Sequence, residues 1–184
     1  MSTASTSTAS TGNPVTGRSV TGRGPIAEET KREIDQGYQQ TLDRLYATTP
    51  GSRELVAKSR GVLVFPKVYA AGFVVGGEYG EGELRVANQV AGYYRTTTGS
   101  LGLQIGAQSK ALVFIFMNEE ALNKFRAGNG WAGGVDASVA VLKAGANGAV
   151  DVSAGGASTV AFIMTNAGLM ANLNIEGTKV TRIE

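Results

Sequence analysis

The spacing of hydrophobic positions changes near Gly61, and this change separates a helical start from a strand-rich remainder. Between Pro25 and Pro50, apolar residues recur every three or four positions, which predicts an amphipathic helix. Its apolar stripe comprises Ile34, Tyr38, Leu42 and Leu45. Pro25 suits a first helical turn, and Pro50 with the following glycine ends the pattern. A short second helix is predicted from Ser52 to about Lys58.

After Gly61 the pattern is typical of short strands separated by turns. Continuous apolar runs occupy 62–65, 73–75, 111–116 and 159–164, alternating runs occupy 101–105, 135–141 and 169–175, and 178–183 closes the chain. Asn118 is predicted to cap a short internal helix over 119–126. About eight strands without a βαβ rhythm predict a mainly β (α+β) fold with an antiparallel barrel-like or sandwich core. The 26 glycines favour the barrel-like version, because glycine permits sharp coiling.

The first 24 residues differ in composition from the rest of the chain. They are rich in Ser, Thr and Gly and carry only Arg18 and Arg23 as charged residues. Such a segment has little apolar surface to bury, so residues 1–24 are predicted to be a flexible tail. Residues 25–184 are predicted to form one folded domain.

The amino-acid composition argues against most enzyme classes. The chain has no cysteine and no histidine, which excludes the usual serine triads, cysteine nucleophiles and zinc sites. Glu81 and Glu83 are close enough to suggest a carboxylate pair, but an acidic turn between strands is the favoured interpretation. A net charge of only +2 argues against a nucleic-acid partner. We therefore expect no catalysis, cofactor, metal or small-molecule substrate.

Two segments resemble functional motifs without meeting their requirements. Residues 76–82, with the sequence GGEYGEG, are rich in glycine like a nucleotide loop. Their spacing is wrong, no helix pattern follows, and the carboxylates would repel phosphate, so a strand-turn-strand element is predicted. Residues 152–175 carry no formal charge, but their asparagines and alternation favour a buried strand pair over a transmembrane helix.

Four basic residues, Arg53, Lys58, Arg60 and Lys67, form the densest positive stretch of the chain. A solvated helix end is one interpretation, and a docking surface for anionic lipid headgroups is the other. Each Lys or Arg near an anionic leaflet contributes about 1 kcal/mol, so four give roughly 4 kcal/mol, or about a millimolar Kd. Stable attachment would therefore need a headgroup pocket, an inserted apolar side chain or a lipid anchor.

Trp131 is the single tryptophan and stands in a glycine-rich segment, residues 128–134. Core packing is the favoured interpretation of a single tryptophan. On a loop, however, its amphipathic ring suits a lipid interface, so Trp131 joins the candidate lipid-binding residues.

The order of motifs resembles that of the SYLF domain family over about residues 35–183. The motifs are KSRGVLVFPK at 58–67 with AGF at 71–73, GGEYGEG at 76–82, GSLGLQIGAQ at 99–108, GGVDASV at 133–139 and GLMANLNIEG at 168–177. The second of these is closest to the bacterial branch. The resemblance implies a lipid-binding domain without catalytic activity; eukaryotic relatives bind phosphoinositides, and fungal relatives bind and bundle actin filaments.

Two departures from the family pattern limit what the resemblance implies. Relatives commonly carry a lysine where this chain has Ala70, and residues 28–44 hold five acidic against three basic residues, unlike the basic eukaryotic lipid-binding helix. We therefore expect general binding of anionic phospholipid, with a phosphoinositide-type headgroup as one option. A protein-interaction module, for actin filaments or a cell-envelope partner, is the alternative.

The family resemblance also bears on localisation. Bacterial relatives are mostly exported or lipoprotein-like, which implies the cell envelope or periplasm. We expect membrane association through a signal that this chain does not contain. A cytoplasmic location is the alternative.

Overall fold

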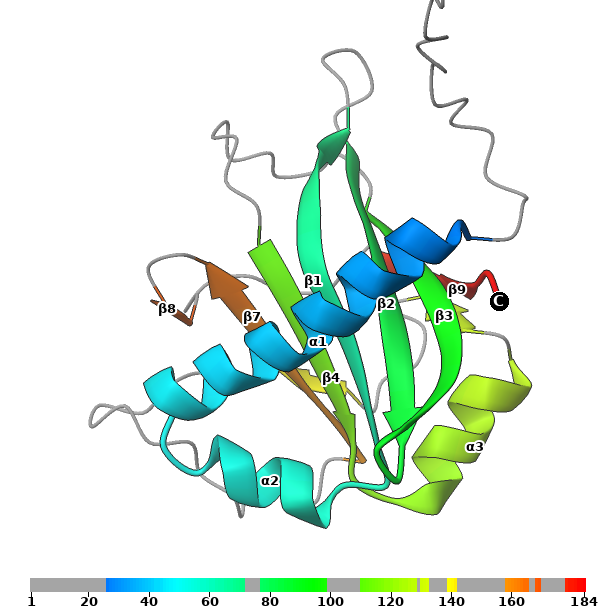
Figure 1. Ribbon diagram of the computed structural model, residues 1–184. Coiled ribbons are helices and arrows are strands. Elements are labelled where there is room, and N and C mark those ends of the chain that lie inside the picture. The colour runs from blue at the N-terminus through cyan, green and yellow to red at the C-terminus, as the bar shows by residue number, and fades with distance from the viewer. Residues whose placement is uncertain are drawn as a thin grey trace, which may run out of the picture.

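A strongly curved β-sheet organises the fold, and helices lie against both of its faces (Figure 1). The computed structural model describes residues 26–71, 77–98, 110–128, 130–132, 139–141, 158–165, 168–169 and 178–184. The predicted tail at 1–24 and the predicted strands at 73–75 and 101–105 lie outside these residues, as do parts of the runs at 135–141 and 169–175.

The described strands form one sheet in the order β5-β9-β3-β2-β1-β4-β7-β6, and β8 pairs with β7. Their bounds are β1 (Gly61–Ala71), β2 (Gly77–Val86), β3 (Gln89–Thr98), β4 (Lys110–Phe116), β5 (Gly130–Ala132), β6 (Val139–Val141), β7 (Thr159–Thr165), β8 (Gly168–Leu169) and β9 (Thr178–Arg182). All described pairings are antiparallel except β6 with β7. Six of these strands make an antiparallel half-barrel, which confirms the α+β prediction in its barrel-like form.

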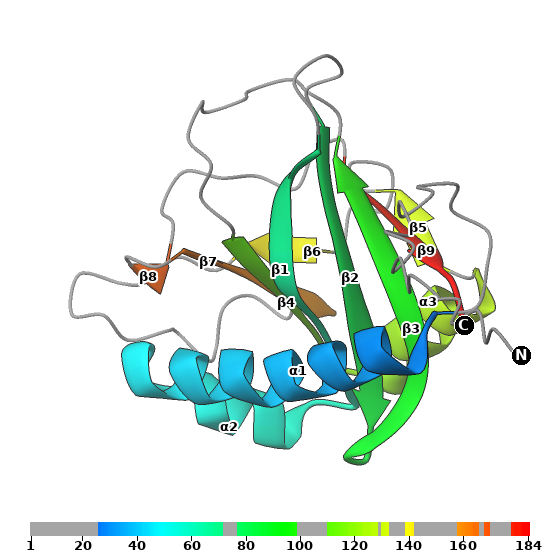
Figure 2. The same ribbon diagram turned by 45° about the horizontal axis from the view of Figure 1, so that its top comes forward.

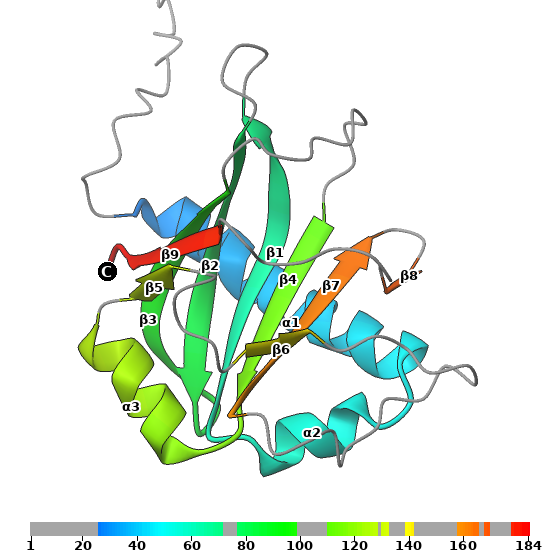
Figure 3. The ribbon, with the colours of Figure 1, turned by 180° about the vertical axis from the view of Figure 1, so that it is seen from behind.

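The helices agree closely with the sequence pattern. They are α1 (Glu28–Thr48), α2 (Ser52–Lys58) and α3 (Glu119–Ala127). All four residues of the predicted stripe on α1 are buried, and Leu55 of α2 is buried with them. Figure 2 shows α1 and α2 together along one face of the sheet. Figure 3 shows the opposite side of the sheet, where α3 lies near β3 and β5.

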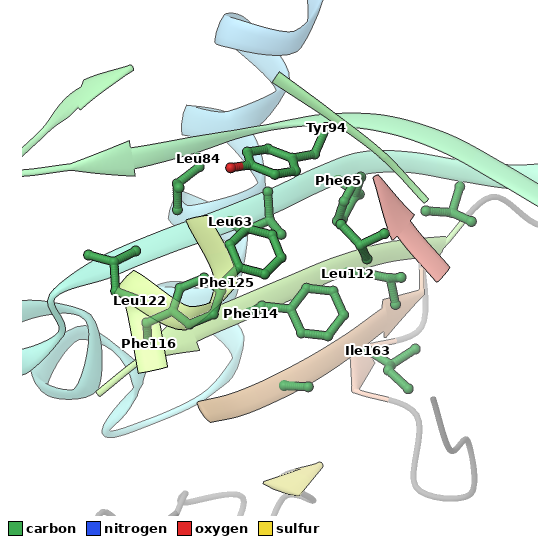
Figure 4. Close-up of a cluster of buried hydrophobic side chains, with 13 residues drawn as sticks. Leu63, Phe65, Leu84, Tyr94, Leu112, Phe114, Phe116, Leu122, Phe125 and Ile163 are labelled. Carbon is green, nitrogen blue, oxygen red and sulfur yellow. The ribbon is translucent and has the colours of Figure 1, made fainter. Parts of the chain in front are cut away.

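Both faces of the central strands are buried, which explains their continuous apolar runs. On the α1 side, the core joins α1 and α2 to alternate residues of the sheet; it includes Leu45, Leu55, Val64, Val113 and Phe162. On the other side, α3 covers an aromatic-rich core that includes Phe65, Phe114, Phe116, Tyr94 and Phe125 (Figure 4). The central position of β4, between β1 and β7, confirms the prediction for residues 111–116.

A bulge in β1 controls how α1 and β2 approach this strand. The register of β1 shifts between Val64 and Lys67 against β2, and Pro66 lies within this irregularity. Proline has no N–H to donate, so a bulge accommodates it inside a sheet. Pro66 also approaches α1 so closely that a β-carbon on Gly37 would lie 2.6 Å from its Cβ. Glycine at this point of α1 lets the helix lie directly on the bulge.

One prediction and one alternative interpretation of local structure are wrong. The segment read as strand-turn-strand lies, over its described residues 77–82, in the continuous strand β2, so Glu81 and Glu83 are strand residues and not an acidic turn. Trp131 lies in β5, which pairs with β9, and not on a loop. In both cases cross-strand hydrogen bonds decide the conformation despite a glycine-rich sequence.

The cap of α3 gives a first test of the fold. The side-chain Oδ1 of Asn118 accepts a hydrogen bond of 2.8 Å from the backbone N–H of Ala121, as the sequence predicts. We expect Asn118→Ala to lower the free energy of unfolding by about 1 kcal/mol, because one helical N–H loses its partner. Urea denaturation measures this change. Asn118→Asp keeps an acceptor at the cap and should be close to wild type; equal losses in both variants would contradict the assignment.

Candidate functional site

Three of the four predicted basic residues lie together around α2. Arg53 and Lys58 belong to this helix, Arg60 stands directly before β1, and all three side chains are exposed. Ser59 follows the last residue of the helix, and its hydroxyl donates a 2.6 Å hydrogen bond to the carbonyl of Val56. The backbone N–H of Arg60 donates to the carbonyl of Phe116 at 2.8 Å, which fixes the chain where it enters the sheet.

These three residues, which we call the α2 basic cluster, have one acidic neighbour on the same helix, Glu54. The Arg53 guanidinium lies 4.5 Å from the centre of the Tyr46 ring, a cation–π distance. Among the described residues, no carboxylate is within ion-pair distance of Arg53, Lys58 or Arg60. The cluster therefore presents a net positive surface at one end of the sheet.

A groove of about 440 Å³ opens beside the α2 basic cluster. Its lining residues come from α1, α2, the start of β1 and the hairpin that joins β2 to β3. Its lining comprises Tyr38, Gln39, Leu42, Tyr46, Val56, Ala57, Ser59, Arg60, Gly61, Val62, Arg85, Ala87 and Asn88. This lining contains two arginines and no carboxylate. The groove thus suits an anion with an apolar part better than a cation.

The β2–β3 hairpin, which borders the groove, has two central residues in a backbone conformation that few residue types adopt easily. Ala87 and Asn88 have φ angles of 51° and 66°, so both central residues of the turn are left-handed. This geometry matches the twist of the flanking strands, and asparagine tolerates it well. The turn brings the Asn88 amide to the groove.

Arg85 forms the wall between the groove and a buried acidic cluster. Its guanidinium stacks on the Tyr38 ring at 4.1 Å, and its Nε donates a 2.6 Å hydrogen bond to Glu83 Oε1. The Glu83 side chain is completely buried, and its Oε2 has no hydrogen-bond partner among the described residues. On the far side, the Tyr93 hydroxyl donates to Asp35 Oδ1 at 3.1 Å.

Burial, followed by the neighbouring Asp35 carboxyl, raises the pKa of Glu83 to about 8, although Arg85 opposes this shift. Glu83 is therefore largely protonated at neutral pH. The carboxyl groups of Glu83 and Asp35 have no donor between them when both are ionised. The proton on Glu83 supplies this donor. A protonated Glu83 cancels less of the Arg85 charge than a carboxylate would.

Lys67 does not belong to the α2 basic cluster. It lies seven residues beyond Arg60 along β1, about 20 Å away in an extended strand. Its cross-strand neighbour is Glu81, a residue that also contacts Arg95 at 3.4 Å. The structure thus divides the predicted basic stretch into two separate surfaces.

Beside Lys67, two tyrosines form a partly exposed pair on the portions of β1 and β2 that extend past α1 (Figure 1). The rings of Tyr69 and Tyr79 meet edge to face with centroids 6.0 Å apart, and Tyr69 is 51% exposed. The Tyr79 hydroxyl donates to Glu81 Oε1 at 2.6 Å. Burial and this carboxylate raise the pKa of Tyr79 to about 12. Glu81 and Arg95 thus hold the Tyr79 ring in place.

Trp131 is also remote from the α2 basic cluster. Its strand β5 is separated from β1 by β9, β3 and β2, which is about 19 Å along the sheet. Its backbone partner is Val180 of β9. The proposed lipid-binding set therefore includes three residues that lie together and two that lie elsewhere.

Of the groove residues, sequence reasoning named only Arg60 as a binding residue, and Tyr46, Arg85 and Asn88 are among those that it missed. Tyr46 follows Leu42 by four positions, so the helical stripe could have indicated it. Asn88 stands between two strands and is a typical turn residue. Nothing in the sequence pattern around Arg85 indicates that it faces a helix.

Glu81 and Glu83, the candidate carboxylate pair of the sequence, have different environments. Glu81 is partly exposed with Arg95, whereas Glu83 is buried with Arg85. Within the described residues, no group of three acidic side chains could hold a metal ion. No described helix is both long and apolar enough to cross a membrane.

Residues 97–183 match the model of the Ysc84 family, described as Las17-binding protein actin regulator. The match supports a Ysc84 domain, also called the SYLF domain, over residues 97–183. Domains of the family are associated with actin regulation and lipid binding and are generally non-catalytic. No curated protein matches the chain.

The match confirms the resemblance over the second half of the chain. The Ysc84 region contains β4, α3 and β5 to β9, which include Trp131 and much of the aromatic core. The α2 basic cluster and the groove precede it. These features are therefore argued from this chain's own geometry and not from the family match.

Proposed function

We propose that this chain binds anionic phospholipid at a membrane surface through the α2 basic cluster. The observation that supports the proposal is that Arg53, Lys58 and Arg60 are exposed, close together and without an ion-pair partner among the described residues. Uncompensated cations on one surface attract an anionic leaflet, whereas paired charges do not.

The strength of this attraction limits what the cluster does alone. Three basic residues near an anionic leaflet contribute about 3 kcal/mol. This gives weak, reversible binding, so a stable complex needs a second contribution from a headgroup site or an anchor. A location at the cell envelope, with such an anchor, stays a prediction from the sequence.

Charge reversal in the cluster tests the proposal. We expect Lys58→Glu/Arg60→Glu to weaken binding to phosphatidylglycerol-containing vesicles by at least about tenfold, because attraction becomes repulsion at two positions. Flotation with vesicles of graded phosphatidylglycerol content measures the affinity. Binding by the wild type should also fall as salt is raised, since exposed charges are screened over about 8 Å at physiological ionic strength.

Two matched reversals distinguish a local site from net charge. Lys124→Glu changes an exposed lysine on α3, and Lys67→Glu changes the basic residue that lies on the other surface. Combined in one variant, the two reversals change the net charge as much as Lys58→Glu/Arg60→Glu does, and they should reduce binding much less. If a folded Lys58→Glu/Arg60→Glu variant binds vesicles like the wild type, the proposal is wrong.

A protein partner is the second candidate, because the family is described as a Las17-binding actin regulator. The Tyr69–Tyr79 pair, with Lys67 and Arg95 beside it, offers an aromatic surface away from the α2 basic cluster. Co-sedimentation with actin filaments, using Tyr69→Ser as the test variant and Lys58→Glu/Arg60→Glu as the comparison, would identify this activity. Pelleting that depends on Tyr69 and not on the cluster would favour it.

A further inference from the structure

The two halves of α1 are attached to the sheet by different kinds of contact. In the second half, Tyr38, Leu42 and Leu45 belong to the hydrophobic cluster that α1 shares with α2 and the sheet. In the first half, residues 28–36, Ile34 is the one buried apolar side chain, and neither hydrophobic cluster of the described residues includes it. Polar contacts therefore hold much of the first half in place.

These polar contacts join α1 to β2, to β3 and to the last residue of the chain. The Lys31 ammonium pairs with the Glu184 carboxylate and lies 5.4 Å from the centre of the Tyr93 ring. The Tyr93 hydroxyl donates to Asp35 Oδ1 at 3.1 Å, and Arg85 Nη2 donates to the Asp35 main-chain oxygen at 3.5 Å. Contacts of this kind, partly open to water, stabilise less than the burial of several large apolar side chains. The first half of α1 is thus the more weakly attached half.

Gly37 lies where the two halves of α1 meet. Glycine is among the poorest helix formers, because it has the most backbone freedom to lose. The helix also crosses the β1 bulge at this point, since a β-carbon on Gly37 would lie 2.6 Å from Cβ of Pro66. Bending at Gly37 therefore costs little and leaves the second half of the helix packed.

The buried carboxyl group of Glu83 lies at the attachment of the first half and faces Asp35. Its charged and titratable neighbours come from α1, β2 and β3, and they are Asp35, Tyr38, Arg85 and Tyr93. On β1 the residue opposite Glu83 is Val64, which does not titrate. Burial raises the pKa of both tyrosines, so both are neutral at neutral and mildly alkaline pH. Arg85 attracts a Glu83 carboxylate, and the Asp35 carboxylate repels it.

We propose that residues 28–36 form an arm that the proton on Glu83 holds against the sheet, and that the arm lifts when this proton leaves for the solvent. With the proton present, Glu83 donates toward Asp35 across the interface. Without it, two carboxylates face each other out of contact with water, which is unfavourable. Lifting the arm separates them and hydrates both.

The arm also borders the groove. When it lifts, Arg85 loses its contact with the Asp35 main-chain oxygen, so one wall of the groove changes with pH. The arm itself does not depend on the proposed membrane function, because every contact that holds it lies within this chain.

The size of the effect follows from the proton affinity of Glu83 in the two states. Burial and the Asp35 carboxyl raise the pKa of Glu83 to about 8 when the arm is docked, whereas a hydrated Glu83 returns toward the ordinary value of 4.5. The docked arm therefore binds the proton more tightly, and low pH favours docking. Between these two values, each pH unit shifts the ratio of lifted to docked arm about tenfold toward the lifted state.

Hydrogen exchange of single amides in the folded protein tests the arm. We expect the protection factors of residues 31–37 to fall on the order of 100-fold between about pH 5.5 and about pH 8.5, after correction for intrinsic exchange rates. They should also stay below those of residues 42–45, in the second half of the same helix. Equal protection of the two halves at the higher pH would mean that α1 opens only as a whole and would overturn the inference. So would protection of residues 31–37 that does not change with pH, as simple fraying of the helix end predicts.

Two substitutions assign the pH response to Glu83. Glu83→Gln has the shape of the protonated acid and no proton to lose, so residues 31–37 should keep their protection at the higher pH. Glu184→Gln removes the ion pair with Lys31, and should lower the protection of the arm by a similar factor at both pH values. Its pH response should remain, because the hydrogen bond from Lys31 lowers the pKa of Glu184 and keeps it charged throughout. A response that persists in folded Glu83→Gln, or that disappears in Glu184→Gln, would overturn the inference; the wild-type measurement decides alone if Glu83→Gln does not fold.

Discussion

Gly82→Ala is expected to destabilise the folded state by at least about 3 kcal/mol, the largest effect that we anticipate for a single methyl group in this chain. A β-carbon at this position would lie 2.1 Å from the carbonyl oxygen of Val64 and 2.7 Å from Cδ1 of Phe65. The first contact is with backbone and the second with a completely buried ring. Neither can move away without disturbing the sheet.

The reason for this close approach is the bulge in β1. Two residues of β1, Phe65 and Pro66, lie opposite Gly82 of β2, so the β1 backbone comes unusually near. Circular dichroism during urea unfolding measures the loss. Gly92→Ala is the matched control, since its nearest contact would be 3.2 Å and involves the terminal residue Glu184. A folded Gly82→Ala protein as stable as Gly92→Ala would show that the register of β1 and β2 is different.

The second large effect concerns the pH dependence of stability, which Glu83 controls. Its pKa rises from an ordinary value of 4.5 to about 8 on folding. Between these two values the folded state holds the proton more tightly than the unfolded state. The stabilising effect of this proton is therefore complete below pH 4.5 and is lost progressively as the pH rises through about 8. The loss is on the order of 4 kcal/mol.

We expect Glu83→Gln to remove most of this pH dependence. Glutamine has the shape of the protonated acid, can donate toward Asp35 and carries no charge to bury. The variant should melt at a higher temperature than the wild type at alkaline pH, and the two should converge in acid. Thermal unfolding of both proteins, measured from pH 4.5 to above pH 8, tests this expectation. Glu81→Gln is the control, because that side chain keeps contact with water; parallel pH profiles for Glu83→Gln and the wild type would contradict the role of Glu83.

Both predictions concern positions that the sequence pattern misread. The glycines and carboxylates of residues 76–82 look like a turn because glycine is common in turns. Gly82 is instead required by a strand that comes close from a distant part of the chain. Glu81 and Glu83 are two residues apart in β2, so their side chains lie on the same face. However, α1 covers only Glu83. Local spacing cannot indicate where a covering helix ends.

The sequence by itself determined the elements whose signals are local. The three- and four-residue spacing on α1, the bounds of α2, the asparagine cap of α3 and the buried run of β4 are all confirmed. The order of motifs also indicated the family, which the match over residues 97–183 confirms. These features depend on periodicity and on hydrogen bonds between residues a few positions apart.

Only the tertiary structure decided which functional residues meet. Lys67 is close to Arg60 in sequence, but an extended strand carries it to the other end of the sheet. Arg85 and Asn88 are distant from α2 in sequence, but the β2–β3 hairpin returns them to the groove. Strand pairing and helix docking bring together residues that no short-range pattern connects, and the charge of the groove depends on how they pack.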